Sequence, residues 1–369
     1  MAKTSPIWAS PRNRRSFLKG TTVGTVAALS SLPAPAIAQS KFRWKMVTCW
    51  PKNFPGLGTG AQRIADRIAA MSDRQLEVKL FAAGELVPAF EVFDAVREGT
   101  AECGHDAPYY WIAKNRSAPF FCTVPGGLTP QEQMGWIYHG GGQQLWDELY
   151  APFGLRAWMA GLNGMQFIGW FRNEINSLDD VRGLKIRMAG LHAEVFNRLG
   201  ATAVNLPGGE IMAALQSGVI DAAEWGGPWM DVAFGFYKVA KYCYGPGVHE
   251  PAAAPSLVVN LEAYQSLPKH LQSIVRHAAD AEVGYLLGEF TAFNGIGLQS
   301  LLNEHDVNVR TLPKDVLRRW FEVSADVVSE TAQDGDINRR IYDSWSKFRK
   351  EALALAPYAE YGFMAHRSV

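Results

Sequence analysis

The fold is decided by the stretch Leu178-Asp179-Asp180-Val181-Arg182-Gly183-Leu184-Lys185-Ile186-Arg187-Met188. Its polar first half predicts a turn that ends at Gly183, and its apolar second half predicts a strand over Leu184–Met188. The following segments predict a helix, a strand and a helix in turn: His192–Leu199, Ala203–Leu206 and Ile211–Ser217. This alternation is typical of a mostly parallel sheet with helices on its faces.

The same order precedes this stretch. Phe42–Thr48 predicts a strand, Ile64, Ile68 and Met71 recur at helical spacing, and the alternating residues Gln75–Phe81 predict a second strand. A helix is expected after Pro88. Further strands are expected at these segments: Leu155–Met159, Met165–Phe171 and Ser256–Asn260.

Beyond Pro268 the pattern is helical, with a long first helix and two more at Val316–Val328 and Ile337–Leu355. We therefore predict an α/β protein with the two-lobed architecture of periplasmic binding proteins and long C-terminal helices. The expected lobes are 39–160 and 161–260, and the helical region 261–369 is expected to pack on both. A cleft between lobes is a common place for a ligand.

Composition excludes several classes of protein. Of 369 residues, 48% are hydrophobic and 20% are charged, which excludes a mainly disordered, collagenous or disulfide-scaffold chain. Lys and Arg number 36, as do Asp and Glu, so no polycationic surface for nucleic acid is predicted. The four cysteines leave two possibilities open: two disulfides in any of three pairings, or four buried thiols.

The first 38 residues predict an export signal. Asn13-Arg14-Arg15-Ser16-Phe17-Leu18-Lys19 precedes a short apolar run that ends in Ala36-Ile37-Ala38, a small-x-small cleavage pattern. The paired arginines resemble a twin-arginine signal, although the general route is not excluded. The mature chain is expected to begin near Gln39 and to reside in the periplasm, without a membrane span.

Familiar enzyme motifs are missing from the sequence. Gly56-Leu57-Gly58-Thr59-Gly60 lacks dinucleotide spacing, and His139-Gly140-Gly141-Gly142 has no accompanying G-x-S-x-G elbow. The eight histidines form no H-E-x-x-H or Cys/His cluster. These observations favour a binding function, with an exported oxidoreductase as the rival.

Four segments carry the distinctive chemistry: Ala83–Thr100 with Tyr109-Tyr110, Gly164–Phe171, Asp180–Met188 and Ile220–Pro228. At these residues the chain resembles the extracytoplasmic solute-binding proteins of TRAP transporters, and most of all their 2-oxoacid (α-keto acid) branch. The resemblance covers essentially the whole mature chain. Its most specific parts are Arg182-Gly183-Leu184-Lys185-Ile186-Arg187 and the later Asp-Ala-Ala-Glu-Trp-Gly-Gly-Pro run at 221–228.

The resemblance implies a transport function without enzymatic activity. Such a protein captures a carboxylate between its lobes and delivers it to the small and large membrane permease subunits of the transporter. Its relatives dimerise through a long C-terminal helix, so a homodimer is a further expectation. The implied ligand is a small 2-oxo monocarboxylate such as pyruvate, bound with a cation. Lactate, C4-dicarboxylates and sugar acids are the alternatives within the same fold.

Arg187 is the residue that the resemblance assigns to the ligand carboxylate. The planar guanidinium donates two parallel hydrogen bonds to a carboxylate, which Lys does not. Tyr109 and Tyr110 match the family's tyrosine pair, which supplies hydroxyl donors and an aromatic wall. The alternative interpretations are a surface salt bridge for Arg187 and ordinary core packing for the tyrosines.

Glu224 requires a separate explanation, because a carboxylate about 4 Å from an anionic ligand costs on the order of 4 kcal/mol. A cation between the two reverses the sign. By resemblance, Glu224, the Gln166 side chain and the Trp225 main-chain carbonyl hold this ion, and their hard oxygens suit Na⁺ or Ca²⁺. Otherwise Glu224 is a helix cap or a surface carboxylate.

Glu250 matches a further family glutamate at the ligand site. In this chain it lies in Gly247-Val248-His249-Glu250-Pro251, where the branch usually has two tryptophans before the glutamate. His249 is therefore expected to enlarge the pocket, to donate to a longer or hydroxylated ligand, or to face solvent.

Overall fold

The computed structural model describes residues 42–367. The expected signal at 1–38 and its cleavage site lie outside the described residues. The expected α/β class is observed, with two sheets. The first has the order β2-β1-β3-β10-β4, with these bounds: β1 Phe42–Thr48, β2 Leu76–Phe81, β3 Cys103–Asp106, β4 Leu155–Met159 and β10 Ser256–Asn260. Strands β1, β2 and β3 are parallel, and β10 is antiparallel to its neighbours β3 and β4.

The second sheet has the order β11-β9-β5-β8-β6-β7. Its strands are short: β5 Gly169–Phe171, β6 Lys185–Arg187, β7 Thr202–Val204, β8 Ala222–Ala223, β9 Tyr242–Tyr244 and β11 Asn308–Arg310. Strand β6 is parallel to both β7 and β8, so the carboxyl ends of these three strands meet at one edge. That edge positions two of the predicted site residues.

Helices cover both sheets. The α-helices are α1 Leu57–Met71, α2 Val92–Arg97, α3 Pro130–His139, α4 Gly142–Tyr150, α5 Gly190–Arg198, α6 Gly208–Ser217, α7 Pro228–Phe234, α8 Leu261–Ser266, α9 Lys269–Asn303, α10 Lys314–Glu330, α11 Asp336–Leu355 and α12 Glu360–His366. Single 3₁₀ turns include η2 Pro108–Trp111 and η5 Leu178–Val181, the latter where the sequence predicts a turn.

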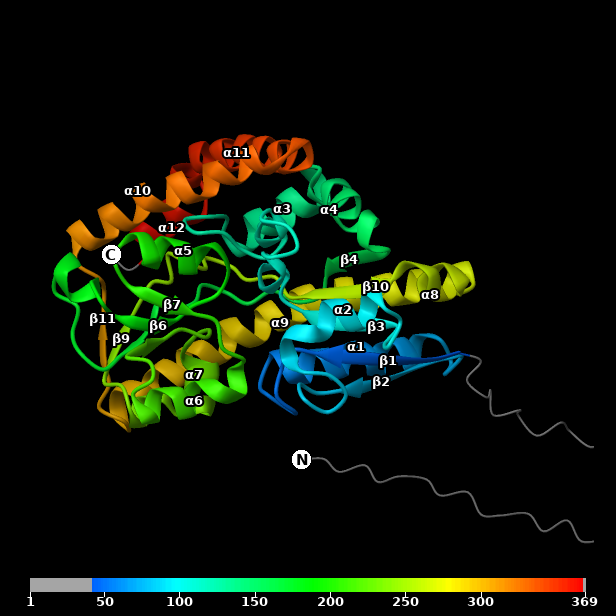
Figure 1. Ribbon diagram of the computed structural model, residues 1–369, viewed down its shortest axis with the longest axis horizontal. Helices are drawn as coiled ribbons and strands as arrows, with labels where there is room; N and C mark the ends of the chain where they lie inside the picture. The colour runs from blue at the N-terminus through cyan, green and yellow to red at the C-terminus, as the bar shows by residue number, and fades with distance from the viewer. Residues whose placement is uncertain (1–41, 368–369) are drawn as a thin grey trace, which may run out of the picture. The chain divides into compact units, whose positions relative to one another are not determined.

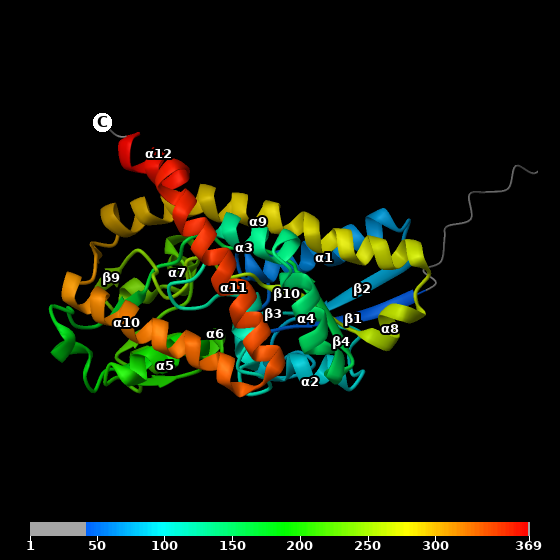
Figure 2. The ribbon, with the colours of Figure 1, turned by 90° about the horizontal axis from the view of Figure 1, so that it is seen from above.

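Helix α9 connects the two halves of the described chain. It packs against α1 beside the first sheet and against α7 beside the second (Figures 1 and 2). Helices α10 and α11 lie along the top of the view in Figure 1, where α10 contacts α5 and α11 contacts α3 and α4. The long apolar periodicity after Pro268 therefore corresponds to a helix buried along one side, with Leu271, Val275 and Leu286 inaccessible to solvent.

The chain crosses between the sheets more than once. One crossing joins β4 to β5, another joins β9 to β10, and a third runs through α9 to β11. Strand β10, from the segment expected in the second lobe, thus pairs in the first sheet, and β11, from the expected helical region, pairs in the second. Local sequence patterns identify a strand, but its partner is set by contacts distant in sequence.

The strand expected at Met165–Phe171 is shorter in the structure and begins at Gly169. The residues before it make main-chain bonds to two other segments: Gln166 N donates to Glu250 O in the β9–β10 crossing, and Phe167 N donates to Gly226 O in the loop between β8 and α7. Gly169 has φ 139°, and a Cβ there would lie 2.5 Å from Ala223 O. Glycine therefore permits the close approach of β5 to β8.

All four cysteines are buried and unbridged, so the structure favours the second of the two open possibilities. Between residues 42 and 367, no helix has the length and apolar character needed to cross a membrane.

Candidate ligand and cation site

The predicted site residues come together where the crossing segments meet the second sheet. Arg187 is the last residue of β6 and pairs with Ala223 of β8, so Glu224 follows immediately beside it. Gln166 lies in the β4–β5 crossing and Glu250 in the β9–β10 crossing. The parallel register of β6 and β8 therefore places a cation and an anion at one sheet edge.

Arg187 is 1% exposed and is fixed by several acceptors. Its Nη1 donates to the Glu224 carboxylate Oε1 and, at 2.9 Å, to the Glu224 main-chain oxygen. Nε donates to Leu206 O at 3.2 Å, whereas Nη2 has only a long 3.5 Å contact with the Tyr110 hydroxyl. The guanidinium lies 5.2 Å from the centroid of the Trp225 ring. The Nε and Nη1 atoms of the guanidinium are thus fixed by hydrogen bonds, whereas Nη2 is the most weakly hydrogen-bonded of its three nitrogens.

Opposing effects set the charge of this pair. Burial raises the pKa of the Glu224 carboxyl, but Arg187 and His249 lower it, and the net pKa lies below the ordinary value. Burial lowers the pKa of Arg187, and Glu224 raises it to above its ordinary value. Both groups therefore remain ionised as a buried ion pair.

Gln166 and Glu250 form a second polar contact beside the pair. Gln166 Nε2 donates to Glu250 Oε2 at 2.8 Å. Burial, and then the charge of Glu224, raise the pKa of Glu250 well above its ordinary value. Gln166 Oε1 and Glu250 Oε1 are buried and have no hydrogen-bond partner in the protein. Two oxygen atoms are therefore available to a bound cation or ligand.

The tyrosines line a small cavity next to these groups. Tyr109 and Tyr110 belong to η2, which follows strand β3 of the first sheet in the chain. Their rings meet edge to face, with 4.8 Å between the ring centroids. With Gln166 and Trp225 they contribute to the cavity wall. Because Tyr110 also approaches Arg187, the cavity lies between groups positioned by the two sheets.

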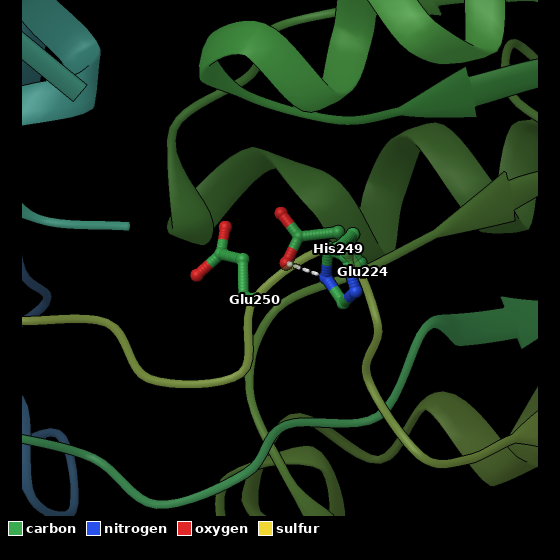
Figure 3. Close-up of side chains that lie close together, drawn as sticks. All are labelled: Glu224, His249 and Glu250. Atoms are coloured by element: carbon green, nitrogen blue, oxygen red, sulfur yellow. Dashed lines mark ion pairs between the residues drawn. The ribbon is translucent and has the colours of Figure 1, made fainter. Parts of the chain in front are cut away.

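Two histidines, His249 and His192, also lie next to the Arg187–Glu224 pair. The family resemblance assigns no role to either of them. His249 is buried, so the alternative of a solvent-facing side chain is wrong. Its Nε2 lies 3.6 Å from Glu224 Oε2 (Figure 3). His192 of α5 packs edge to face on His249 at 5.5 Å. Burial lowers the pKa of His192 to about 3, which keeps that ring neutral. Nothing in the local sequence marks His192 as a neighbour of the site.

Comparison with known proteins identifies the family. Residues 46–334 match the DctP model, described as bacterial extracellular solute-binding protein, family 7. The chain belongs to this family of TRAP transporter solute-binding proteins. It is 40% identical over 312 residues to a monocarboxylate 2-oxoacid-binding periplasmic protein of Nostoc sp. strain PCC 7120, and the match covers 85% of each chain.

Solved structures of family members have the same two-lobed fold. A TRAP periplasmic solute-binding protein of Pseudoalteromonas atlantica T6c, with bound sodium and pyruvate, has a TM-score of 0.85 and 35% identity, over 88% of this chain and 99% of that chain. One from Bordetella bronchiseptica RB50, a mixed occupancy dimer with calcium and picolinate in its bound active site, has a TM-score of 0.86 and 33% identity, over 88% and 97%.

Membership of the family establishes the general role. This is the periplasmic solute-binding component of a TRAP system, a transport protein and not an enzyme, and it works with membrane permease subunits. The family binds small carboxylates. An exported oxidoreductase, the rival considered from the sequence, is therefore wrong.

A buried aspartate near the site generates a pH prediction. Asp231 of α7 accepts a 2.8 Å bond from Trp170 Nε1, yet burial, together with the charge of Glu224, raises its pKa to about 8. In the unfolded chain an aspartate titrates near about 3.9. Between these values the folded protein holds a proton that the unfolded chain releases, so the free energy of unfolding falls by about 1.4 kcal/mol per pH unit.

Asp231→Asn removes this contribution, so its free energy of unfolding should fall less steeply than that of the wild type as pH rises from about 5 to about 8. Urea unfolding across this range measures the slopes. Asp179→Asn, at a position 80% exposed, is the control and should keep the wild-type slope. Parallel profiles for wild type and Asp231→Asn would contradict the assignment.

Proposed function

We propose that this protein captures a small 2-oxo monocarboxylate such as pyruvate, together with a Na⁺ or Ca²⁺ ion. The observation that carries the proposal is the buried Arg187, whose Nη2 points toward the Tyr110 hydroxyl at the cavity. In the complex, the guanidinium and this hydroxyl donate to the ligand carboxylate, and Tyr109 forms the adjoining wall. Glu250, joined to Gln166, lies at the same ligand site.

The proposed cation ligands are the Gln166 Oε1 atom, the Glu224 carboxylate and the Trp225 main-chain carbonyl. Gln166 Oε1 and Glu224 Oε2 are both buried without hydrogen-bond partners, as expected of atoms that bind an ion. These donors are hard oxygens, which suit Na⁺ and Ca²⁺. The ligands of the two related structures support this arrangement, since pyruvate and picolinate each carry a second donor atom next to the carboxylate and can chelate one ion.

The net charge of the proposed site favours a ligand with one carboxylate over a ligand with two. Arg187 and a monovalent ion supply two positive charges, and Glu224 removes one, which leaves one for the ligand. Among residues 42–367, Arg187 is the one basic Arg or Lys side chain that is buried. A C4-dicarboxylate would leave its second carboxylate without a cationic partner at the site, at a high desolvation cost. Lactate keeps the single carboxylate and replaces the 2-oxo group by a hydroxyl, a weaker ligand for the ion.

Arg187→Lys tests the proposal. The wild-type melting temperature should rise on addition of pyruvate with Na⁺ or Ca²⁺, because a ligand that binds the folded state stabilises it. Lys presents no planar fork, so the variant should lose this rise. Thermal shift over a panel of pyruvate, lactate, succinate and sugar acids, with and without each ion, measures it.

Arg182→Lys is the matched control, because Arg182 lies in the same segment but is 71% exposed. It should keep the wild-type response. An undiminished pyruvate response in Arg187→Lys overturns the role of Arg187, and a larger wild-type response to succinate than to pyruvate overturns the ligand class.

We further propose that residues 1–38 are removed on export. The Ala36-Ile37-Ala38 pattern supports cleavage before Gln39. Intact-mass analysis of the periplasmic protein should give a chain of residues 39–369. A mass that retains the paired arginines would contradict cleavage at this position.

A homodimer formed through the C-terminal helices is a third proposal. Large apolar side chains are exposed near the end of α11, in the 3₁₀ turn Ala356–Tyr358 that follows it, and in α12: Leu353, Leu355, Tyr358, Tyr361, Phe363 and Met364. Such a concentration of exposed apolar area is typical of an interaction surface. The dimeric relative from Bordetella bronchiseptica supports a second copy as the occupant.

Light scattering should give twice the chain mass for the mature protein. The double variant Tyr361→Ser with Phe363→Ser should be monomeric and retain its pyruvate response, because both residues belong to α12, which contributes no residue to the cavity wall. A monomeric wild type at micromolar concentration would overturn the proposal.

A further inference from the structure

Three buried side chains of this site form a cluster whose chemistry differs from that of the oxygen site proposed above. Glu224, His249 and Glu250 each offer one atom, and these atoms all lie within 4.8 Å of one another (Figure 3). All three side chains are at most 1% exposed. Glu224 comes from the end of β8, and the other two come from the β9–β10 crossing.

The distance between His249 and Glu224 is informative. His249 Nε2 and Glu224 Oε2 are 3.6 Å apart, too far for an effective hydrogen bond. Two bonds of about 2.1 Å to one metal ion at a tetrahedral angle would place such a nitrogen and oxygen about 3.4 Å apart. The observed separation therefore matches two ligands of one ion more closely than a direct hydrogen-bonded pair.

The hydrogen bonding of the three side chains also indicates a metal site. Glu224 Oε2, Glu250 Oε1 and both ring nitrogens of His249 are buried without hydrogen-bond partners. The other oxygen of each carboxylate is engaged, by Arg187 for Glu224 and by Gln166 for Glu250. Each glutamate is thus held by one oxygen and presents the other. Leaving such atoms unpaired destabilises the folded protein, and a bound metal ion would remove this cost.

We propose that Glu224, His249 and Glu250 form a mixed nitrogen and oxygen site for a borderline divalent cation of the Zn²⁺ or Co²⁺ class. An imidazole nitrogen suits these ions, whereas Na⁺ and Ca²⁺ take oxygen ligands. The site rests on the proposed function, because it shares Glu224 with the proposed Na⁺ or Ca²⁺ site and Glu250 with the proposed ligand site.

Sharing Glu224 makes the two sites mutually exclusive. Its Oε1 is committed to Arg187, so only Oε2 is available to an ion. A borderline divalent cation on His249 and Glu250 therefore removes the carboxylate oxygen that the ion accompanying the ligand needs. Occupation of the mixed site should lower the affinity for pyruvate in the presence of Na⁺.

Cobalt titration of the chelator-treated mature protein tests the site, because Co²⁺ bound by nitrogen and oxygen at low coordination number absorbs visible light more strongly than the aqueous ion. The wild type should bind one Co²⁺ per chain with such a spectrum, and Zn²⁺ should displace it. His249→Phe keeps a ring of similar shape without a ligand atom and should weaken Co²⁺ binding at least about tenfold. Should that variant not fold, Glu250→Gln makes the same test.

His277→Asn is the matched control, since His277 is 73% exposed and should not alter the spectrum. A wild type without Co²⁺ binding, whose melting temperature still rises with pyruvate and Ca²⁺, overturns the mixed site alone. Co²⁺ binding that both site variants retain also overturns it. Co²⁺ binding in a protein that no 2-oxoacid stabilises would instead overturn the proposed function and leave the mixed site standing.

Discussion

The buried ion pair between Arg187 and Glu224 is the interaction on which the rest of the site depends. Each partner makes the burial of the other possible, because removing one partner of such a pair costs about 3–5 kcal/mol. The pair is kept rigid by main-chain acceptors, Glu224 O and Leu206 O, at the edge of parallel strands. A guanidinium held in this way has lost its rotamer freedom before any ligand arrives, so less entropy is lost on binding.

The segments that cross between the two sheets explain how the Arg187–Glu224 ion pair is connected to both lobes. Arg187 and Glu224 are attached to the second sheet, whereas Tyr109 and Tyr110 follow β3 of the first. Gln166 and Glu250 lie in the segments that join the sheets. Under the proposed function, a ligand that contacts Arg187 and Tyr110 together couples its own binding to the relative position of the two sheets.

The sequence predicted the helices and strands whose own apolar residues recur at regular spacing. It missed the strands that exist only because neighbouring strands pair with them. The β1, α1, β2 order and the long α9 follow from their own apolar spacing, whereas the two-residue β8 has no pattern of its own and exists because β5 and β6 flank it. The same distinction applies to the site. Arg187, Glu224 and Gln166 were found through motifs, and the structure brings them together, whereas His192 is adjacent only because α5 packs behind the β9–β10 crossing.

The concentration of unpaired polar atoms separates this region from an ordinary core. Seven buried side-chain atoms without partners belong to Gln166, His192, Glu224, Trp225, His249 and Glu250. At about 1–3 kcal/mol each, their combined cost is comparable to the whole stability of a typical domain. A core selected for stability alone would replace them with apolar side chains. Their concentration at one point, around a charged pair and between two sheets, supports the proposal that an ion and a polar ligand bind there.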